Sequence, residues 1–147
     1  MAQYVKDFGK PVVSSASLNA SAAYEISSQA NYIYVAKTTE IGAIGTIMQS
    51  RDYSELLEKL GVSAESIASA ESKDSGYGTR PLTDEERTYY QRMIDQINEC
   101  FIQNVAEGRD MSEDDVRALA TSLTFTGIDA VENGLADEVG TREDAVA

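Results

Sequence analysis

The chain has 147 residues, of which 42% are hydrophobic and 25% charged, a composition typical of a globular protein with one core. The net charge of −13 provides no basic surface for nucleic acid, so we expect no nucleic-acid partner. The sequence contains no histidine. This excludes a Ser-His-Asp triad, a Cys-His pair and histidine metal sites, so a hydrolytic base would have to be Lys, Asp or Glu.

No stretch approaches the roughly 18 consecutive apolar residues of a membrane span, and residues 1–11 lack the apolar core of a signal peptide. We therefore expect a soluble chain that neither crosses a membrane nor directs its own export. The single cysteine, Cys100, excludes an intrachain disulfide. Its place in a helical pattern between Ile97 and Phe101 predicts a core or boundary position.

The first half of the chain alternates between strand-like and helix-like segments. Runs of β-branched and aromatic residues predict strands, small or periodic residues predict helices, and paired glycines predict a loop. In the helix that Gly61 ends, Leu56, Leu57 and Leu60 are expected to face inward. The predicted elements are a helix end at 1–10, strands at 11–16, 32–36, 46–50 and 62–70, helices at 20–30 and 53–60, and a loop at 38–45.

The second half is mainly helical. After a polar loop at 72–81, Thr83 and Glu86 form a capping box that opens a helix to about Glu107, ended by Gly108. Further helices are predicted after Ser112 and at 126–133, and a last strand and turn at 135–140. The order predicts one α/β domain over 1–147, with strand–helix repeats followed by a helical C-terminal part.

Ser21 is the first candidate for chemistry. It follows a predicted buried strand and opens a helix, with small neighbours that leave room for a substrate backbone. Backbone N–H groups at a helix start are free, so the N–H of Ala22 could stabilise a tetrahedral oxyanion. Serine is also a favoured N-cap residue, and the local pattern by itself favours that simpler interpretation.

Lys73 is the second candidate, as a general base. An amine acts as a base only in its neutral form, which burial favours. The neighbouring carboxylates of Glu71 and Asp74 would favour the charged form unless they point away. Spacing alone therefore favours a solvated loop lysine.

The chain from Lys10 to Gly140 resembles the catalytic domain of signal peptide peptidases of the SppA type. Ala20–Tyr24 resembles the family's Ala-Ser-Gly-Gly-Tyr nucleophile motif, and Ser72-Lys73-Asp74 falls on its Tyr-Lys-Asp position. The order and spacing of the matching segments carry the resemblance. The other matches are residues 10–13, 39–47, 57–62, 82–87, 105–109, 125–130 and 134–140.

The resemblance implies a ClpP/crotonase-like layered fold and a serine endopeptidase with a Ser-Lys dyad. Ser21 would be the nucleophile, Lys73 the general base and Ala22 the oxyanion N–H donor. The implied substrates are signal-peptide remnants or other short unfolded peptides, with no cofactor and no metal. The implied assembly is a homo-oligomeric ring or dome in which Ser21 and Lys73 could come from adjacent protomers, and full-length relatives are membrane-associated.

The sequence departs from this family in two places. The family's strand–helix region before the nucleophile strand is missing, so we expect a domain truncated at its N-terminus, without the second oxyanion donor. Ala43 stands where many relatives have a serine that binds the catalytic lysine, and Ser72 is a candidate substitute.

Two other functions remain open from the sequence. The first is a catalytically inactive peptide-binding or assembly module that keeps the fold. The second is an acyl-CoA enzyme of the crotonase type, against which the Ser21–Lys73 spacing argues.

Overall fold

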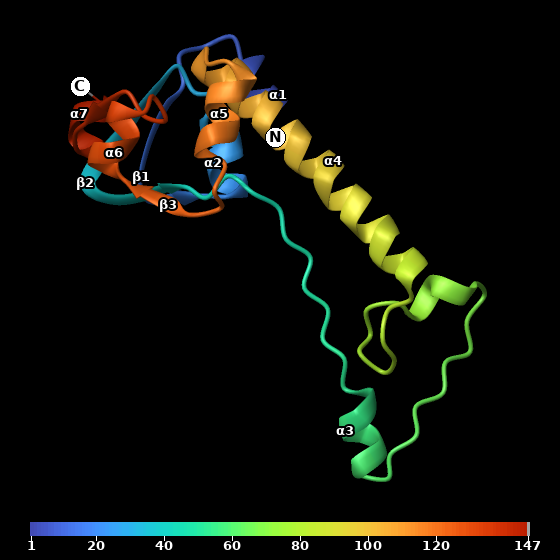
Figure 1. Ribbon diagram of the computed structural model, residues 1–147. Coiled ribbons are helices and arrows are strands. Elements are labelled where there is room, and N and C mark those ends of the chain that lie inside the picture. Colours follow the sequence, from blue (N-terminus) through green and yellow to red (C-terminus); the bar gives the residue numbers. More distant parts are fainter. Residues whose placement is uncertain (147) are drawn as a thin grey trace. The chain divides into compact units, whose positions relative to one another are not determined.

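The computed structural model describes residues 1–146. The chain divides into two compact units, drawn with their elements in Figure 1. The first unit is Met1–Thr46 together with the chain from Ile97 onward, and the second is Ile47–Gln96. None of the helices in residues 1–146 is long and apolar enough to cross a membrane.

A mixed four-stranded sheet organises the first unit. The central strand β2 (Tyr32–Gly42) pairs in parallel with β1 (Val13–Ala20) along one edge. Along its other edge it pairs antiparallel with β3 (Thr124–Thr126) and parallel with β4 (Glu138–Val139). The long central strand thus joins segments from both ends of the chain.

The β1–β2 ladder contains an irregularity that the buried Thr39 stabilises. The register shifts between Ala16 and Leu18, so that β2 carries extra residues opposite β1. The Thr39 hydroxyl accepts a hydrogen bond from the N–H of Ala36 and donates one to the carbonyl of Ala16. This side chain therefore replaces ladder hydrogen bonds where the pairing is interrupted.

Helices surround this sheet, and two of them begin at side-chain caps. Ser112 and Thr126 accept hydrogen bonds from the backbone N–H groups of Asp115 and Asp129, as helix-start residues do. The helices of this unit are α1 (Ala2–Lys6), α2 (Ala22–Ser27), α5 (Glu113–Leu119), α6 (Gly127–Glu132), α7 (Arg142–Val146) and the C-terminal part of α4 (Asp84–Arg109).

The hydrophobic core lies entirely within the first unit. Its members come from β2, α2, α4, α5 and α6, and from the connecting segments that follow α2, β2 and α6. At about 25 cal/mol per Å² of apolar area, their burial is the main stabilising term for the unit. The core residues are Tyr24, Ala30, Ile33, Val35, Ile41, Ile44, Phe101, Ile102, Val105, Ala106, Val116, Ala130, Leu135 and Ala136.

The second unit has no comparable core among its described residues. It holds α3 (Ser54–Lys59), the 3₁₀ helix η1 (Glu71–Asp74) and the first turns of α4, connected by segments without regular secondary structure. Among residues 47–96, all of which the structure describes, only Gly78 and Glu86 are buried. Polar contacts rather than apolar burial therefore order this part of the described chain.

The α/β class, the helix starts at Thr83, Ser112 and Thr126, and the short helix before Gly61 are confirmed. The ClpP/crotonase-like layering and the assignment of 1–147 to one truncated domain stay predictions.

Several predicted elements are wrong. Residues 46–50 and 62–70 form no strand, because a strand needs a neighbour and none in residues 1–146 pairs with them. The predicted loop at 38–45 is in large part the end of β2. Leu56 and Leu60 are exposed, at 52% and 67%, since no core residue among 1–146 packs against α3.

Two expectations for α4 are also wrong. Cys100 is exposed rather than at the core or its boundary, as is the nearby Ile97, because only the C-terminal turns of α4 bury their apolar side. Gly108 lies inside the helix, which ends at Arg109. A Cβ at Gly108 would clash with the carbonyl oxygen of Ser28, so a glycine lets α4 approach the end of α2 closely.

Candidate active site

Ser21 occupies a sharp turn between β1 and α2. Its backbone has φ 55° and ψ −132°, outside the left-handed well near ψ +30 to +60° that non-glycine residues sometimes occupy. Such a conformation costs on the order of 1–3 kcal/mol and persists only where the surrounding structure imposes it. Here the Ser21 N–H donates to the carbonyl of Gly42 at 2.8 Å, and the Ser21 carbonyl accepts from the N–H of Glu25 at 3.0 Å.

The hydroxyl of Ser21 does not serve as a helix cap within the described chain. Ser21 is the N-cap of α2 by position, yet its side chain accepts no capping hydrogen bond there. Ser21, Ala22 and Ala23 are all exposed. The N–H of Ala22, the first residue of the helix, has no acceptor within it. The turn therefore presents an accessible hydroxyl next to a free backbone donor.

The rest of α2 is held firmly to the core. The buried Tyr24 donates its hydroxyl to the carbonyl of Leu135 at 2.9 Å, and burial raises the pKa of Tyr24 well above its usual value. Asn104 of α4 donates to Glu25 at 2.7 Å, and Gln29 donates to the Asn104 carbonyl. These contacts fix the helix that begins at Ser21.

Asn19 lies two residues before Ser21, on β1. It is buried, and its side-chain oxygen accepts from the Ser27 hydroxyl at 2.9 Å. Its side-chain nitrogen has no partner among residues 1–146. The amide thus links the end of β1 to the end of α2 and adds to the rigidity of the turn.

A polar network centred on Asp137 binds the C-terminal end of α4 within the first unit. Arg109 donates to both carboxylate oxygens of Asp137, at 2.7 and 3.0 Å, and to the carbonyl of Gly134. Asp137 also accepts from the N–H of Ile33 on β2. A nearby hollow beside Arg109 and Asp137 is lined by polar, charged and small residues, and no serine, threonine or cysteine is among its described residues.

Lys73 lies on the short helix η1 of the second unit and is exposed. It borders a groove of about 510 Å³ together with Asp74, Tyr77, Thr79 and residues 64–69. No ion pair among residues 1–146 involves Lys73. The burial that would favour a neutral amine is thus not supplied by the described part of the chain.

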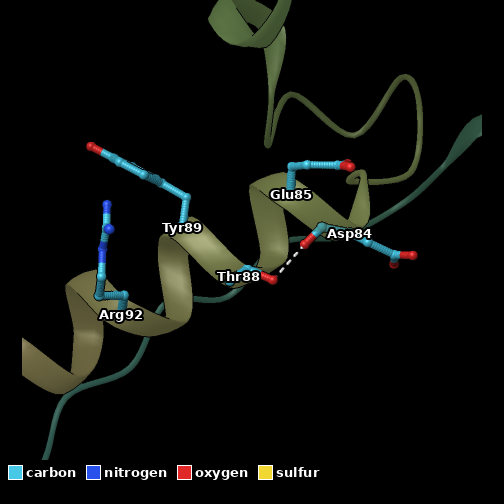
Figure 2. Close-up of a pocket in the computed structure, with 5 residues that line it drawn as sticks. All are labelled: Asp84, Glu85, Thr88, Tyr89 and Arg92. Carbon is cyan, nitrogen blue, oxygen red and sulfur yellow. Dashed lines mark hydrogen bonds between the residues drawn. The ribbon is translucent and has the colours of Figure 1, made fainter.

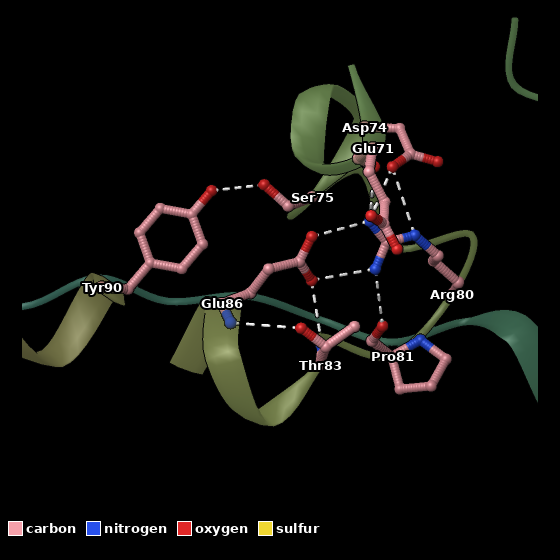
Figure 3. A network of polar contacts seen from close by, with 8 residues as sticks. All are labelled: Glu71, Asp74, Ser75, Arg80, Pro81, Thr83, Glu86 and Tyr90. Atoms are coloured by element: carbon pink, nitrogen blue, oxygen red, sulfur yellow. Dashed lines mark hydrogen bonds and ion pairs between the residues drawn. The ribbon is translucent and has the colours of Figure 1, made fainter. Parts of the chain in front are cut away.

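The loop after Lys73 is bound to the start of α4 by Arg80. Figure 3 shows its guanidinium between the carboxylates of Asp74 and Glu86. Glu86 is only 5% exposed; Arg80 and then the N–H of Thr83 lower its pKa to about 2. The Ser72 hydroxyl also lies near Glu86 and contributes to that shift, so Ser72 faces this network.

Figure 2 shows a second depression, of about 400 Å³, on the first turns of α4. Asp84, Glu85, Thr88, Tyr89 and Arg92 line it, and the Thr88 hydroxyl donates to the carbonyl of Asp84. All five come from one helix, so reactive groups do not converge there. Among residues 1–146, no three Cys, Asp or Glu side chains gather closely enough to hold a metal ion.

Of the three predicted site residues, Ser21 and Ala22 share one turn of the first unit, while Lys73 belongs to the second unit. Arg80 was not predicted from the sequence. The only sequence signal near it was the capping box at Thr83 and Glu86, whose carboxylate Arg80 binds.

Comparison with known proteins agrees with the resemblance described above. A Methanocaldococcus jannaschii protein named as a "putative protease" is 40% identical over 129 residues, which cover 88% of this chain and 42% of that protein. An Enterococcus faecium "putative signal peptide peptidase SppA" is 37% identical over 127 residues, which cover 86% of this chain and 37% of that protein. Protease 4 of Haemophilus influenzae is 34% identical over 143 residues, which cover 97% of this chain and 23% of that protein.

The chain therefore spans less than half the length of each of these relatives. Residues 5–147 match the family model described as peptidase family S49. That match covers nearly the whole chain, and so the chain belongs to peptidase family S49.

Proposed function

We propose that this chain supplies the catalytic residues of a serine peptidase, with Ser21 as nucleophile. The observation that carries the proposal is the backbone of Ser21, a non-glycine residue with φ 55° and ψ −132° at an exposed strand-to-helix turn. Nucleophilic serines are presented on such strained turns in unrelated hydrolases. Family membership and the names of the relatives, which include the serine protease SPPA of Arabidopsis thaliana, support the same activity.

In the proposed reaction, the Ser21 hydroxyl oxygen attacks a peptide carbonyl carbon while the neutral amine of Lys73 accepts the hydroxyl proton. The carbonyl oxygen becomes an oxyanion that the N–H of Ala22 stabilises. The C–N bond then breaks, and the Lys73 ammonium returns the proton to the leaving amine. Water, deprotonated by Lys73, hydrolyses the acyl-enzyme and regenerates Ser21.

Peptides that bind in extended form are the proposed substrates. Among residues 1–146, β1 pairs only with β2, so its outer edge keeps unpaired backbone groups beside the Ser21 turn. An extended peptide can add to such an edge through main-chain hydrogen bonds. Signal-peptide remnants and other short unfolded apolar peptides fit this mode.

A homo-oligomer, in the form of a ring or dome, is the proposed working state. Lys73 is exposed within the described chain, whereas shielding from water favours the neutral amine that a general base requires. A neighbouring protomer could provide that shielding, with Ser21 and Lys73 meeting from adjacent copies. The likeness to the capsid assembly protease C of phage lambda, 32% identical over 138 residues, supports an assembled state.

The test is labelling of the purified chain with a fluorophosphonate, beside the variants Ser21→Ala and Lys73→Ala. Ser122→Ala is the matched control, because Ser122 is another exposed serine with a positive φ, 63°, in the first unit. We expect labelling that Ser21→Ala and Lys73→Ala abolish and Ser122→Ala leaves unchanged. If the folded chain takes up no label, the inactive peptide-binding or assembly module becomes the better interpretation.

A further inference from the structure

Arg80 contacts both the short helix η1, which carries Lys73, and the loop that leads from η1 to α4. Its Nε and Nη2 donate to one oxygen of Asp74, at 3.2 and 2.7 Å, and its Nη2 reaches the carbonyl of Glu71 at 3.5 Å. Its Nη1 donates to the carbonyl of Pro81 at 3.0 Å. Figure 3 shows these groups converging on one guanidinium from η1 and from the loop before α4.

Glu86 provides the fixed end of this network. It accepts two hydrogen bonds from Arg80, at 2.8 and 2.9 Å, and a third from the N–H of Thr83 at 2.9 Å. The Thr83 hydroxyl in turn accepts from the N–H of Glu86, which completes a capping box. The guanidinium is therefore oriented by a buried carboxylate on the first turn of a helix.

Asp74, the residue after Lys73, is the other end of the network. Its side chain is 16% exposed, and Arg80, with a smaller contribution from the Ser66 hydroxyl, holds the pKa of Asp74 below its usual range. Asp74 is thus an anion one residue from the proposed base. Because Arg80 directs two donors at it, its charge is already compensated without Lys73.

The other titratable groups around Lys73 are few. Glu71 lies on the same short helix, and Glu65 and Tyr77 border the same groove. Asp74 is the only one of these that an ion pair engages in the described chain. A free carboxylate at this position would attract the Lys73 ammonium and so favour the protonated form, which cannot act as a base.

We propose that Arg80 is a positioning residue that binds the Asp74 carboxylate and so prevents Asp74 from pairing with the Lys73 amine. This inference rests on the proposed function, in which Lys73 is the general base. The guanidinium suits the role because its planar fork binds Asp74 and Glu86 at once, which a lysine ammonium cannot do with the same geometry.

The first experiment measures how fast the Lys73 amine reacts with an acylating reagent at fixed pH. The intact, folded chain is labelled, and mass spectrometry of its peptides then gives the extent of acylation at each lysine. Lys59 of α3, in the same unit, is the internal reference. We expect Arg80→Ala to lower the reactivity of Lys73 relative to Lys59 by about 3- to 10-fold, the size of effect that one neighbouring carboxylate produces.

The double variant Arg80→Ala/Asp74→Asn separates this role from a merely structural one. If Arg80 acts by occupying Asp74, removing the Asp74 charge restores the Lys73 reactivity. If Arg80 only supports the loop, the double variant stays as low as the single one, and the proposal is overturned. Arg117→Ala is the matched control, because Arg117 forms an equally bidentate pair with Glu99 in the first unit.

The second experiment follows the pH dependence of fluorophosphonate labelling at Ser21. Arg80→Ala should move the acid limb of the rate profile to higher pH, and the added Asp74→Asn should move it back. An unmoved limb would overturn the role of Arg80 in the reaction. A failure of the proposed function is recognised separately. If Lys73 is not the general base, Lys73→Ala will be labelled at Ser21 as fast as the parent chain, whatever effect Arg80→Ala has on the reactivity of the Lys73 amine.

Discussion

Different interactions stabilise the interior of each of the two units. Every buried hydrophobic residue in the described chain lies in the first unit, around β2 and the helices that cover it. The second unit buries Glu86 and Gly78, and its order derives from Arg80 and the carboxylates around it. The proposed nucleophile thus lies on an apolar framework, and the proposed base lies on a polar one.

This difference has a thermodynamic meaning. Apolar burial is insensitive to pH and weakly sensitive to salt, whereas exposed and half-exposed ion pairs weaken as salt rises. Units held by few apolar contacts open locally at a lower free energy than the global unfolding of the protein. The comparison therefore predicts that the same kind of change has unequal effects in the two units.

The largest effect is expected from a cavity in the first unit. Ile102 is fully buried, so Ile102→Ala should lower the free energy of unfolding by about 2–5 kcal/mol. Ile67 of the second unit is 97% exposed, and Ile67→Ala should change it by less than about 0.5 kcal/mol. Urea denaturation followed by circular dichroism measures both. Equal losses would contradict the assignment of the core to the first unit alone.

A smaller loss is expected where α4 approaches α2. In Gly108→Ala the new methyl group would meet the Ser28 carbonyl, and overpacking of this kind costs about 1–3 kcal/mol. Alanine's better helix propensity offsets up to about 1 kcal/mol of that. The exposed Gln103 of the same helix gives the control, Gln103→Ala, which should be near neutral. A Gly108→Ala chain as stable as the parent would show that the two helices can separate freely.

Removing a helix cap should cost about 0.5–2 kcal/mol of helix stability in either unit. In the first unit we expect the loss in global unfolding, and in the second unit we expect it in local amide exchange. Ser112→Ala should lower the global free energy of unfolding, because α5 packs on the core. Thr83→Ala should mainly speed amide hydrogen exchange in the first turn of α4. Thr88→Ala is the control, since that hydroxyl donates within the helix and caps nothing. A global loss from Thr83→Ala would mean that the units unfold as one.

The smallest effect on global stability is expected from acid. The pKa of Glu86 is lowered from 4.5 to about 2 in the folded chain, so its stabilising contribution is complete above about pH 4.5. That contribution is lost as the pH falls from 4.5 towards 2, when Glu86 takes up a proton. Amide exchange in residues 71–86 should rise in this range before exchange in β2 does. In Glu86→Gln, the rise should already be present at neutral pH.

The parts of the fold that depend on nearby residues could be predicted from the sequence. The capping box at Thr83 and the caps at Ser112 and Thr126 need only three or four consecutive residues, and all are present. The prediction of strands at 46–50 and 62–70 was wrong because strand pairing depends on partners far away in the chain. The prediction that the leucines of α3 face inward was wrong for the same reason, because burial needs a partner from elsewhere and none in residues 1–146 covers Leu56 or Leu60.

The candidate site was predictable to a similar extent. The strand-to-helix turn at Ser21 follows from local residue types, whereas its backbone angles depend on the hydrogen bond to Gly42, a residue of another strand. Arg80 was missed because its role depends on the path of the loop between Asp74 and Glu86. The roles of Ser21, Lys73 and Ala22 stay predictions that the labelling experiment tests.

The backbone of Ser21 also bears on how this position can evolve. Glycine adopts positive φ at no steric cost, so Ser21→Gly should be more stable than Ser21→Ala by about 1 kcal/mol, although both lack the hydroxyl. A lineage that had ceased to use the hydroxyl would gain stability by drifting to glycine here. Serine is kept at this position against that gain only while its oxygen is under selection.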